Sequence, residues 1–347
     1  MINKEDYICT TPFKYTETHD HNQFLCCPSW LGTDIWDGKS IESSFLGKKA
    51  NEVRESILDG SYKYCDEVIC PYLSGLKRGK LSRKFVKKNK KSIEHFKKPP
   101  PIKIVNFCFD RSCNFQCPSC RVELINYYGK DRDSVENKLK EVNDILSEKI
   151  HTIYLSGSAD PFYSKSFRKF LQKFKGSKYP NMKNIHLHTN ASLWTQSMWD
   201  TMKEVQPFVK SCEVSIDAAT KDTYEKKTRI GGRWDILLEN LKFITNIKTI
   251  DKFTFSFVVQ DTNYKEMYDF YKLIESYFVD KKVNWRVLLT QIVNWDTFTE
   301  EEFKLKTVHD KEHKEHNNFL NELNKVKSLS NIVHNFSHLT KNEKQII

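Results

Sequence analysis

Three cysteines, Cys113, Cys117 and Cys120, are separated by three and then two residues on one short segment. These spacings place three thiolates on a single loop, close enough to hold three irons of one cubane iron–sulfur cluster. The motif supplies no fourth protein ligand, whereas structural zinc usually takes four ligands in paired short spacings. The triad therefore predicts a [4Fe-4S] cluster with one open iron that can chelate a substrate. Three buried thiols without a cluster are the alternative.

A second set of cysteines lies in the first 75 residues, which are rich in loop-forming sequence and predict one clear helix over 48–58. So short a unit buries only a small core, and a metal or cluster would supply the missing stability. An auxiliary cluster, a zinc site and unligated thiols all remain open for this set. The remaining cysteines, Cys108 and Cys212, fall within expected strands and are interpreted as core residues. The second set consists of Cys9, Cys26, Cys27, Cys65 and Cys70.

Strands and helices alternate from residue 102 onward, and this alternation must position the triad. Helical segments with one apolar face separate the expected strands, which predicts parallel strands joined by right-handed crossovers. The triad directly follows the first of these strands. The fold class expected is α/β, with a partial (β/α)6 barrel, a small cysteine-rich N-terminal domain and a helical C-terminal extension. The expected strands cover 102–109, 151–157, 184–189, 211–217, 252–260 and 283–290.

Several of these strands carry polar residues on one face. Glu213, Ser215 and Asp217 alternate with apolar neighbours in the fourth strand, and His186 and His188 do the same in the third. If the apolar faces pack outward on helices, the polar faces line an interior, which describes a barrel with a polar ligand cavity. A sheet with one solvated face is the alternative.

The 347 residues carry a net charge of +11, and residues 77–98 alone hold eleven Lys and Arg against the single acid Glu94. The rest of the chain is therefore nearly neutral, which excludes a uniformly basic nucleic-acid binder. No apolar run is long enough to span a membrane and the N-terminus over 1–6 lacks the apolar core of a signal peptide, so we expect a cytoplasmic protein whose thiols stay reduced. We expect a cysteine-rich domain over 1–75, a basic linker over 76–101 that ends in three prolines, a core over 102–290 and an extension over 291–347.

The triad after the first strand of a six-fold β/α pattern resembles the radical SAM superfamily, and the likeness covers about residues 102–290. Further motifs of that family recur in order, at the ends of successive strands, where β/α barrels build their sites. The resemblance implies reductive cleavage of S-adenosylmethionine, bound to the open iron, into methionine and a 5′-deoxyadenosyl radical that abstracts hydrogen from a substrate. It implies no specific catalytic residue on the protein. The cofactor-binding residues that it implies are Gly157, Ser158, Asp160, Asn190, Ser215, Asp217 and Arg229.

Individual positions depart from the family pattern. Asp160 stands where the family's "GGE" segment has Glu, and it is expected to face the amino group of S-adenosylmethionine. Ala191 replaces the glycine of a "TNG" turn, and Ser119 stands where many members have an aromatic residue against adenine. Arg229 resembles the arginine that pairs with the methionine carboxylate.

The N-terminal cysteines resemble the SPASM and Twitch modules, which carry auxiliary iron–sulfur clusters but usually follow the barrel. The resemblance implies Cys9, Cys27, Cys65 and Cys70 as ligands of one cluster, with Cys26 as a spare thiol. It also implies a peptide or protein side chain as substrate and an electron donor such as flavodoxin or ferredoxin. A sugar, nucleoside or other small metabolite is the alternative substrate. A non-catalytic iron–sulfur or zinc scaffold that binds nucleic acid through Lys77–Lys98 is the alternative of another class.

Overall fold

The computed structural model describes residues 2–98, 100–156, 158–336 and 339, and its centre is one curved, mostly parallel sheet. Within the described residues this sheet has nine strands in the order β11-β10-β9-β8-β7-β6-β5-β2-β3. Every neighbouring pair is parallel except β2 with β3. The strands are β2 (Tyr15–Thr18), β3 (Gln23–Phe24), β5 (Ile104–Phe107), β6 (Thr152–Leu155), β7 (Asn184–Thr189), β8 (Val209–Ser215), β9 (Lys252–Val259), β10 (Asn284–Gln291) and β11 (Ile332–His334).

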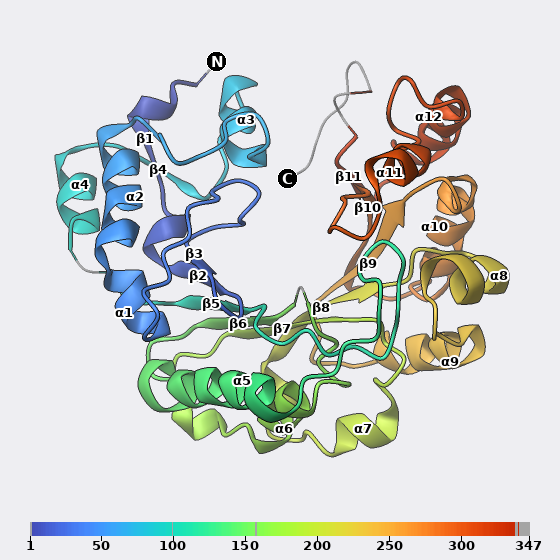
Figure 1. The fold of residues 1–347 in the computed structure, drawn as a ribbon, viewed down its shortest axis with the longest axis horizontal. Helices are drawn as coiled ribbons and strands as arrows, with labels where there is room; N and C mark the ends of the chain where they lie inside the picture. The colour runs from blue at the N-terminus through green and yellow to red at the C-terminus, as the bar shows by residue number, and fades with distance from the viewer. Residues whose placement is uncertain (1, 99, 157, 337–338, 340–347) are drawn as a thin grey trace.

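Helices cover the convex side of the sheet, which curves into an open U (Figure 1). The helices that follow β5, β6 and β7 lie below it in this view, and those that follow β8 and β9 lie to its right. Apolar side chains of the longer helices pack on the sheet, as Phe167 and Phe170 of α6 do on Phe107. These helices are α5 (Gly129–Glu141), α6 (Lys165–Lys173), α7 (Gln196–Asp200), α8 (Lys221–Thr223), α9 (Trp234–Ile244) and α10 (Met267–Ser276), followed by α11 (Glu300–Lys306) and α12 (His316–Val326).

The concave side of the sheet is polar because side chains alternate across each strand. In β7 every second residue is fully buried against the helices, while Asn184, His186 and His188 point to the other face and are only half-buried. The neighbouring strands continue this polar face, and His186 contacts the ring of Tyr154 in β6 and the hydroxyl of Ser211 in β8. The predicted partial barrel with a polar interior is confirmed, and we call this concave space the lumen.

The N-terminal segment is built into the same sheet. Strand β2 pairs in parallel with β5, so that Glu17 lies opposite Asn106 at the edge of the predicted barrel. A second, two-stranded sheet joins β1 (Tyr7–Cys9) to β4 (Phe85–Lys87). The helices of this segment, which lie at the left of Figure 1, are α1 (Ile41–Leu46), α2 (Lys48–Asp59), α3 (Pro71–Lys77) and α4 (Lys90–Phe96).

The stretch predicted as a basic linker is folded rather than extended. It contributes β4 and α4, and the ring of Phe96 packs on Phe13 with ring centroids 4.8 Å apart. The prolines mark only where this stretch ends. Within it, Phe85, Ile93 and Phe96 pack against the N-terminal core, and this packing folds the stretch. Pro99 lies outside the described residues.

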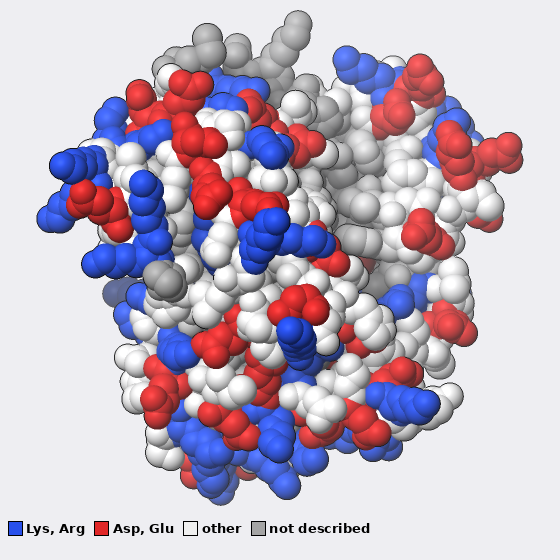
Figure 2. All heavy atoms as spheres, turned by 60° about the vertical axis from the view of Figure 1, so that its left-hand side comes forward, with Lys and Arg blue, Asp and Glu red and all other residues white. Residues whose placement is uncertain are grey.

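Charges of both signs are interspersed over the face that carries the N-terminal segment (Figure 2). Lysines of the basic stretch have acidic or aromatic partners: Lys77 lies 3.0 Å from Glu67, and the Lys84 ammonium lies 4.0 Å from the centroid of the Tyr72 ring. This mixed surface does not form the continuous basic track that nucleic acid would need. None of the described helices is long and apolar enough to cross a membrane.

Candidate functional site

The three cysteines of the triad lie on a loop between β5 and α5, at the carboxyl end of the sheet. Backbone bonds fix this loop to its surroundings, from Cys113 N–H to the Ile125 carbonyl at 3.0 Å and from Gln116 N–H to the Ile230 carbonyl at 2.9 Å. Cys117 is buried, Cys113 is half-buried and Cys120 is exposed. All three border one small cavity of about 80 Å³, together with residues from the ends of β6, β7 and β8.

Each sulfur of the triad has its own nitrogen donor from a different part of the chain. Arg229 Nη1 lies 3.6 Å from Cys117 Sγ, and Arg121 Nη2 lies 3.5 Å from Cys120 Sγ. Asn190 Nδ2 lies 3.7 Å from Cys113 Sγ. Burial raises the pKa of Cys113 to about 11. Two guanidiniums beside these thiols favour their deprotonated forms, which are the forms that bind iron. The donor set therefore fits an iron–sulfur cluster held by three cysteines.

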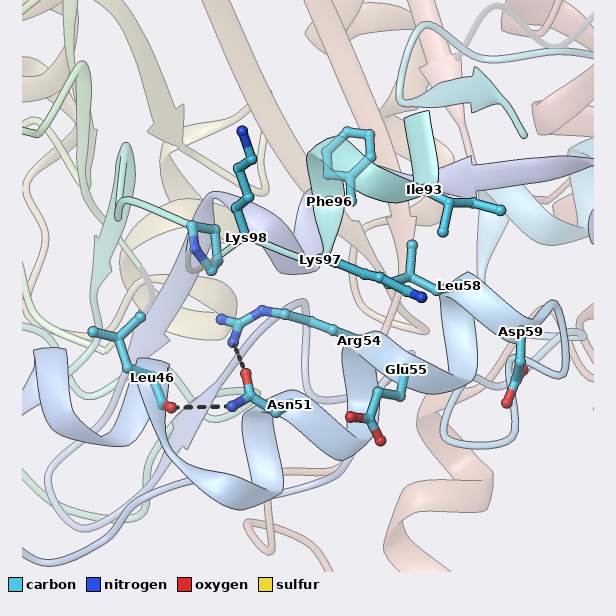
Figure 3. Close-up of a pocket in the computed structure, with 11 residues that line it drawn as sticks. Leu46, Asn51, Arg54, Glu55, Leu58, Asp59, Ile93, Phe96, Lys97 and Lys98 are labelled. Atoms are coloured by element: carbon cyan, nitrogen blue, oxygen red, sulfur yellow. Dashed lines mark hydrogen bonds between the residues drawn. The ribbon is translucent and has the colours of Figure 1, made fainter. Parts of the chain in front are cut away.

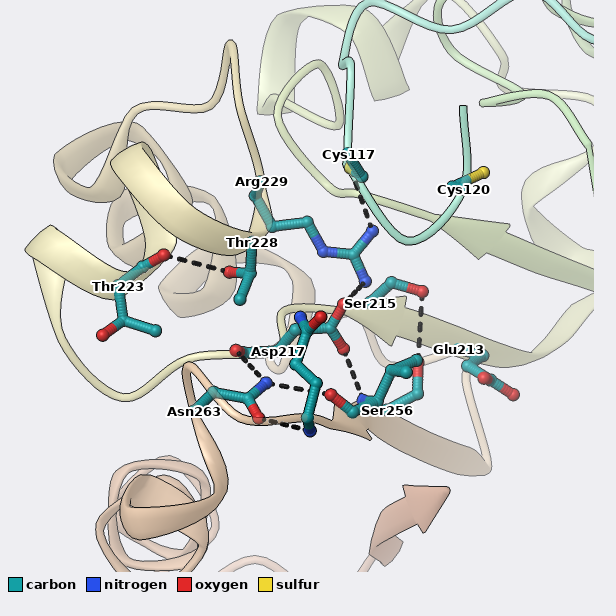
Figure 4. A network of polar contacts seen from close by, with 12 residues as sticks. Cys117, Cys120, Glu213, Ser215, Asp217, Thr223, Thr228, Arg229, Ser256 and Asn263 are labelled. Carbon is teal, nitrogen blue, oxygen red and sulfur yellow. Dashed lines mark hydrogen bonds and ion pairs between the residues drawn. The ribbon is translucent and has the colours of Figure 1, made fainter. Parts of the chain in front are cut away.

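Arg229 is held in place by an ion pair with Asp217. Its Nη2 lies 2.6 Å from Asp217 Oδ2, and the Asp217 side chain is only 1% exposed (Figure 4). Burial lowers the pKa of Arg229, but the charges of Asp217 and Cys117 outweigh burial and raise it overall. The Nε of Arg229 is buried and has no partner among the described residues, so one donor remains for a ligand.

The loop of Arg229 can approach the triad because two glycines follow it. Gly231 adopts a φ of +95°, and a Cβ there would lie 3.1 Å from the Asn114 carbonyl oxygen. A Cβ at Gly232 would meet the Tyr224 ring at 2.6 Å. Larger residues would therefore push this loop away from the cysteines.

Asp160 ties the β6 loop to the end of β7. One carboxylate oxygen accepts hydrogen bonds from the Thr189 hydroxyl at 2.7 Å and from Asn190 N–H at 2.9 Å. The other oxygen accepts bonds from the N–H groups of Phe162 and Tyr163, at 3.0 and 3.1 Å. These contacts give Asp160 a positioning role; its expected contact with an amino group stays a prediction.

The structure brings most of the predicted cofactor-binding residues to the cavity of the triad. Asp217 does not line the cavity but lies behind Arg229, and Gly157 lies outside the described residues. Ala191, which replaces the glycine of the "TNG" turn, keeps a positive φ of 62°. The lining residues that were predicted are Ser158, Asp160, Asn190, Ser215 and Arg229.

Five further residues that line this cavity were not predicted as cofactor or metal contacts. Arg121 directly follows the last cysteine and also donates to the Ser158 carbonyl at 2.7 Å. A basic residue beside a cysteine ligand was the signal available for it. Alternation along its strand had already placed His188 on the polar face. The others carry no such signal, because only the folded loops bring them to the cavity. They are Phe115, Ala159 and Thr189.

The lumen next to this cavity holds a buried polar network. His188 Nε2 lies 2.8 Å from Ser215 Oγ and 3.6 Å from Glu213 Oε1. Burial raises the pKa of Glu213, but the imidazoles of His188 and His186 outweigh burial and leave it below its usual value. Burial lowers the pKa of His186 to about 4. These groups offer a substrate both hydrogen-bond donors and acceptors.

Four of the five N-terminal cysteines interact electrostatically with one another, namely Cys9, Cys26, Cys65 and Cys70. The Tyr62 hydroxyl accepts a bond from Cys9 N–H at 3.1 Å, and the Tyr62 carbonyl accepts one from Cys65 N–H at 2.9 Å. Burial and then the charges of Cys9 and Cys70 raise the pKa of Cys65 to about 12. Burial raises the pKa of Cys26, and the charges of the same two thiols raise it further.

Cys27 has other neighbours. Burial is the main cause of the raised pKa of Cys27, and the charge of Glu17 raises it further. Burial also raises the pKa of Cys108, to which the charges of Glu17 and Cys27 contribute. Cys26 is thus influenced by the charges of Cys9 and Cys70, whereas Cys27 interacts with Glu17 and Cys108.

A larger cavity lies elsewhere. It has a volume of about 800 Å³ and separates α2 from α4 (Figure 3). Its most buried charged residue, Arg54, donates to the Pro12 carbonyl and the Asn51 side chain and stacks on Phe45. These contacts give Arg54 a structural role.

Comparisons with known proteins agree with this site. Residues 109–274 match the family model described as the radical SAM superfamily, and this segment contains the triad, Asp160 and Arg229. No curated protein sequence matches the chain significantly.

Solved structures with a similar fold have low sequence identity. SuiB of Streptococcus suis bound to the precursor peptide SuiA is 13% identical, with a TM-score of 0.42 over 86% of this chain and 66% of that one. SuiB bound to S-adenosylmethionine is 16% identical, with a TM-score of 0.43 over 82% and 60%. Native anSMEcpe with bound AdoMet is 16% identical, with a TM-score of 0.40 over 56% and 52%. The chain thus spans less than two thirds of each of these chains.

The family match and the geometry of the triad lead to the same assignment. The match covers the loop with the three cysteines, the strands that carry the predicted cofactor contacts, and the arginine that reaches the buried cysteine. The family's cofactors are a [4Fe-4S] cluster and S-adenosylmethionine, which the three thiols and the polar rim of the cavity suit. Residues 109–274 are thus similar to the radical SAM superfamily, and the cysteine triad lies within the matched segment.

Proposed function

We propose that this enzyme abstracts hydrogen from a side chain of a peptide or protein. The observation that carries the proposal is the lumen, a polar concave surface across β6, β7 and β8 beside the triad cavity. An open sheet leaves room for an extended chain, and the lumen offers the imidazole of His188, the carboxylate of Glu213 and the guanidinium of Arg286. These groups suit the alternating donors and acceptors of a peptide.

Residues of the chain hold and shield the cofactors in this proposal. Cys113, Cys117 and Cys120 would hold the cluster, and Arg121 and Arg229 would balance its negative charge. When bound, the cluster and S-adenosylmethionine supply the 5′-deoxyadenosyl radical. Phe115 is fully buried under the loop and excludes water from one side of the cavity. Because Cys120 is the exposed member of the triad, we place the docking of flavodoxin or ferredoxin on its side of the loop.

We also propose an auxiliary iron–sulfur cluster in the N-terminal segment, with Cys9, Cys65 and Cys70 as ligands. Proximity favours Cys26 over Cys27 as the fourth ligand. Among the described residues, no three of these sulfurs lie within 4.8 Å of one another. Tetrahedral zinc with bonds of about 2.3 Å would hold its sulfurs roughly 3.8 Å apart, closer together than any three of these sulfurs lie here. Replacing Cys65 and Cys70 together with alanine should lower the iron content by about one cubane and leave the triad cluster in place.

The substrate class can be tested with two fractions of one bacterial extract. The anaerobically reconstituted enzyme is incubated with S-adenosylmethionine, reduced flavodoxin and either a tryptic peptide fraction or a metabolite fraction freed of peptides. Formation of 5′-deoxyadenosine above the rate without substrate is measured by chromatography, and modified molecules are identified by mass spectrometry. We expect stimulation, and a mass change, in the peptide fraction. Stimulation by the metabolite fraction alone would instead support a sugar, nucleoside or other small metabolite as substrate.

Two variants distinguish loss of the cluster from loss of substrate binding. Cys117→Ala should abolish 5′-deoxyadenosine formation with every fraction, because the triad is incomplete. Glu213→Gln leaves the triad and its arginines unchanged, so its basal cleavage should persist while stimulation by peptides falls.

A further inference from the structure

One group of metal-binding side chains belongs to neither cysteine set. Glu17 lies in β2, His19 follows that strand, and Cys108 follows β5. The two strands are parallel neighbours, and Cys108 N–H donates to the Thr18 carbonyl at 2.9 Å, so both strand ends meet at one edge. One ligand atom from each of the three side chains lies within 4.8 Å of the other two. In the described part of the chain, no other three His, Cys, Asp or Glu residues meet this criterion.

The carboxylate of Glu17 is oriented as a metal ligand would be. Its Oε1 lies 2.9 Å from His19 Nε2. Its Oε2 accepts bonds from the Tyr15 hydroxyl at 2.7 Å and from Asn106 Nδ2 at 3.2 Å. Asn106 is itself fixed by the Ser156 hydroxyl, which donates to its Oδ1 at 2.6 Å. Such outer hydrogen bonds are the usual means by which proteins orient metal ligands.

We propose that Glu17, His19 and Cys108 bind one zinc ion at the edge of the lumen. A thiolate, an imidazole and a carboxylate together suit a borderline metal ion such as zinc. Three protein ligands leave a fourth position for water or for a substrate group, as in catalytic zinc sites. The thiol of Cys108 now contacts the Ser156 carbonyl at 3.5 Å. Binding replaces the S–H bond by a zinc–sulfur bond and releases one proton to solvent, with no change of oxidation state.

The site is distinct from the proposed clusters in composition and in place. Glu17 and Cys108 are 8% and 5% exposed, and Glu17 stands in register with Asn106, whose next neighbour across the sheet is Tyr154 of the lumen. A substrate group bound at the open zinc position would therefore lie on the polar side of the sheet. The inference does not depend on whether the substrate is a peptide.

The proposal can be tested by metal binding to the anaerobically reconstituted holoprotein. Protein is titrated with Zn²⁺ and passed through a gel-filtration column, and zinc and iron are measured in the same fractions. We expect about one zinc per chain, and at least a ~10-fold loss of affinity in Cys108→Ser and in His19→Asn, with iron unchanged. The matched controls are Cys212→Ser, a buried thiol in β8, and His21→Asn, an exposed histidine two residues away. Both should bind zinc as the wild type does.

X-ray absorption at the zinc edge gives a second, independent result. We expect one sulfur at about 2.3 Å and nitrogen or oxygen ligands at about 2.0–2.2 Å. Tyr15→Phe leaves every proposed ligand in place but removes a bond to Glu17, and it should weaken zinc binding by about 10-fold in a folded protein. A shell of sulfur alone would assign the zinc to the N-terminal cysteines and overturn the proposal. The proposal would be overturned by equal zinc binding in Cys108→Ser, His19→Asn and their controls, or by no zinc binding at all. Glu17 and His19 would then form only a hydrogen-bonded pair.

Discussion

The guanidinium of Arg229 lies 3.6 Å from the sulfur of Cys117, although 112 residues separate them in the chain. Asp217 holds that guanidinium from the opposite side at 2.6 Å. Asp217 itself follows β8 with a φ of +59° and accepts a bond from Val258 N–H at 2.7 Å, which anchors it to β9. The charge beside the buried cysteine is thus fixed by two strands of the barrel.

Replacing Arg229 with glutamine should make the triad cluster harder to reduce. The variant keeps all three cysteines but removes a positive charge beside Cys117, and a nearby positive charge favours the reduced, more negative cluster. We expect iron content close to that of the wild type and a midpoint potential lower by tens of millivolts, measured by redox titration with electron paramagnetic resonance. Arg233→Gln changes an exposed arginine on the same segment and is the control. An unchanged potential in Arg229→Gln would mean that this arginine does not tune the cluster.

The change Asp160→Asn should destabilise the protein. The carboxylate accepts four bonds from two loops, and an asparagine must present its amide N–H₂ to donors on one side. We expect a loss of roughly 2 to 4 kcal/mol in the free energy of unfolding, measured by urea denaturation under anaerobic conditions. Affinity for S-adenosylmethionine should fall with it, because Asn190 and the loop of Ser158 are displaced. Reduced affinity at unchanged stability would instead support direct contact of Asp160 with the cofactor.

Much of the barrel could be predicted from the sequence because its strands and helices have regular apolar patterns. The strand expected over 184–189 is β7 at the same bounds, and the helix expected over 48–58 ends one residue later. The strand β2 could not be predicted in this way, because its four residues contain little apolar pattern and its parallel partner, β5, is distant in sequence. Likewise, charge counting predicted a linker where three apolar residues determine the packing.

The cysteine triad could be predicted because its chemistry depends on spacing within one loop. The partners of its sulfurs could not, since Asn190 and Arg229 reach it only through the folded ends of β7 and β8. Asp217 shows the same limit: alternation along β8 placed it with Ser215 in the lumen. The positive φ of Asp217 turns the chain there, and its carboxylate binds Arg229 instead.

His186 should make stability depend on pH between about 6.5 and 4. Burial lowers its pKa to about 4 in the folded protein, so the unfolded chain takes up a proton over this range while the folded chain does not. Stability is therefore fully present above pH 6.5 and is lost as pH falls toward 4, by on the order of 3 kcal/mol from this residue. His186→Gln should lose less stability over this range than the wild type in anaerobic urea denaturation. Equal losses in both proteins, with iron content matched, would contradict a buried neutral imidazole.

The adjacent cysteines 26 and 27 give the sharpest test of the N-terminal site. Cys26 interacts with Cys9 and Cys70, whereas Cys27 interacts with Glu17 and Cys108, so the two thiols face different neighbours. Cys26→Ser should therefore remove the iron of about one cubane, and Cys27→Ser should retain it. Iron and sulfide are measured in both variants after anaerobic reconstitution, with the triad variant Cys117→Ala as the reference for the core cluster. Loss of iron in Cys27→Ser alone would show that Cys27, rather than Cys26, is the fourth ligand, as the family resemblance implies. Full iron in both variants would show that neither Cys26 nor Cys27 is a required ligand of a cluster.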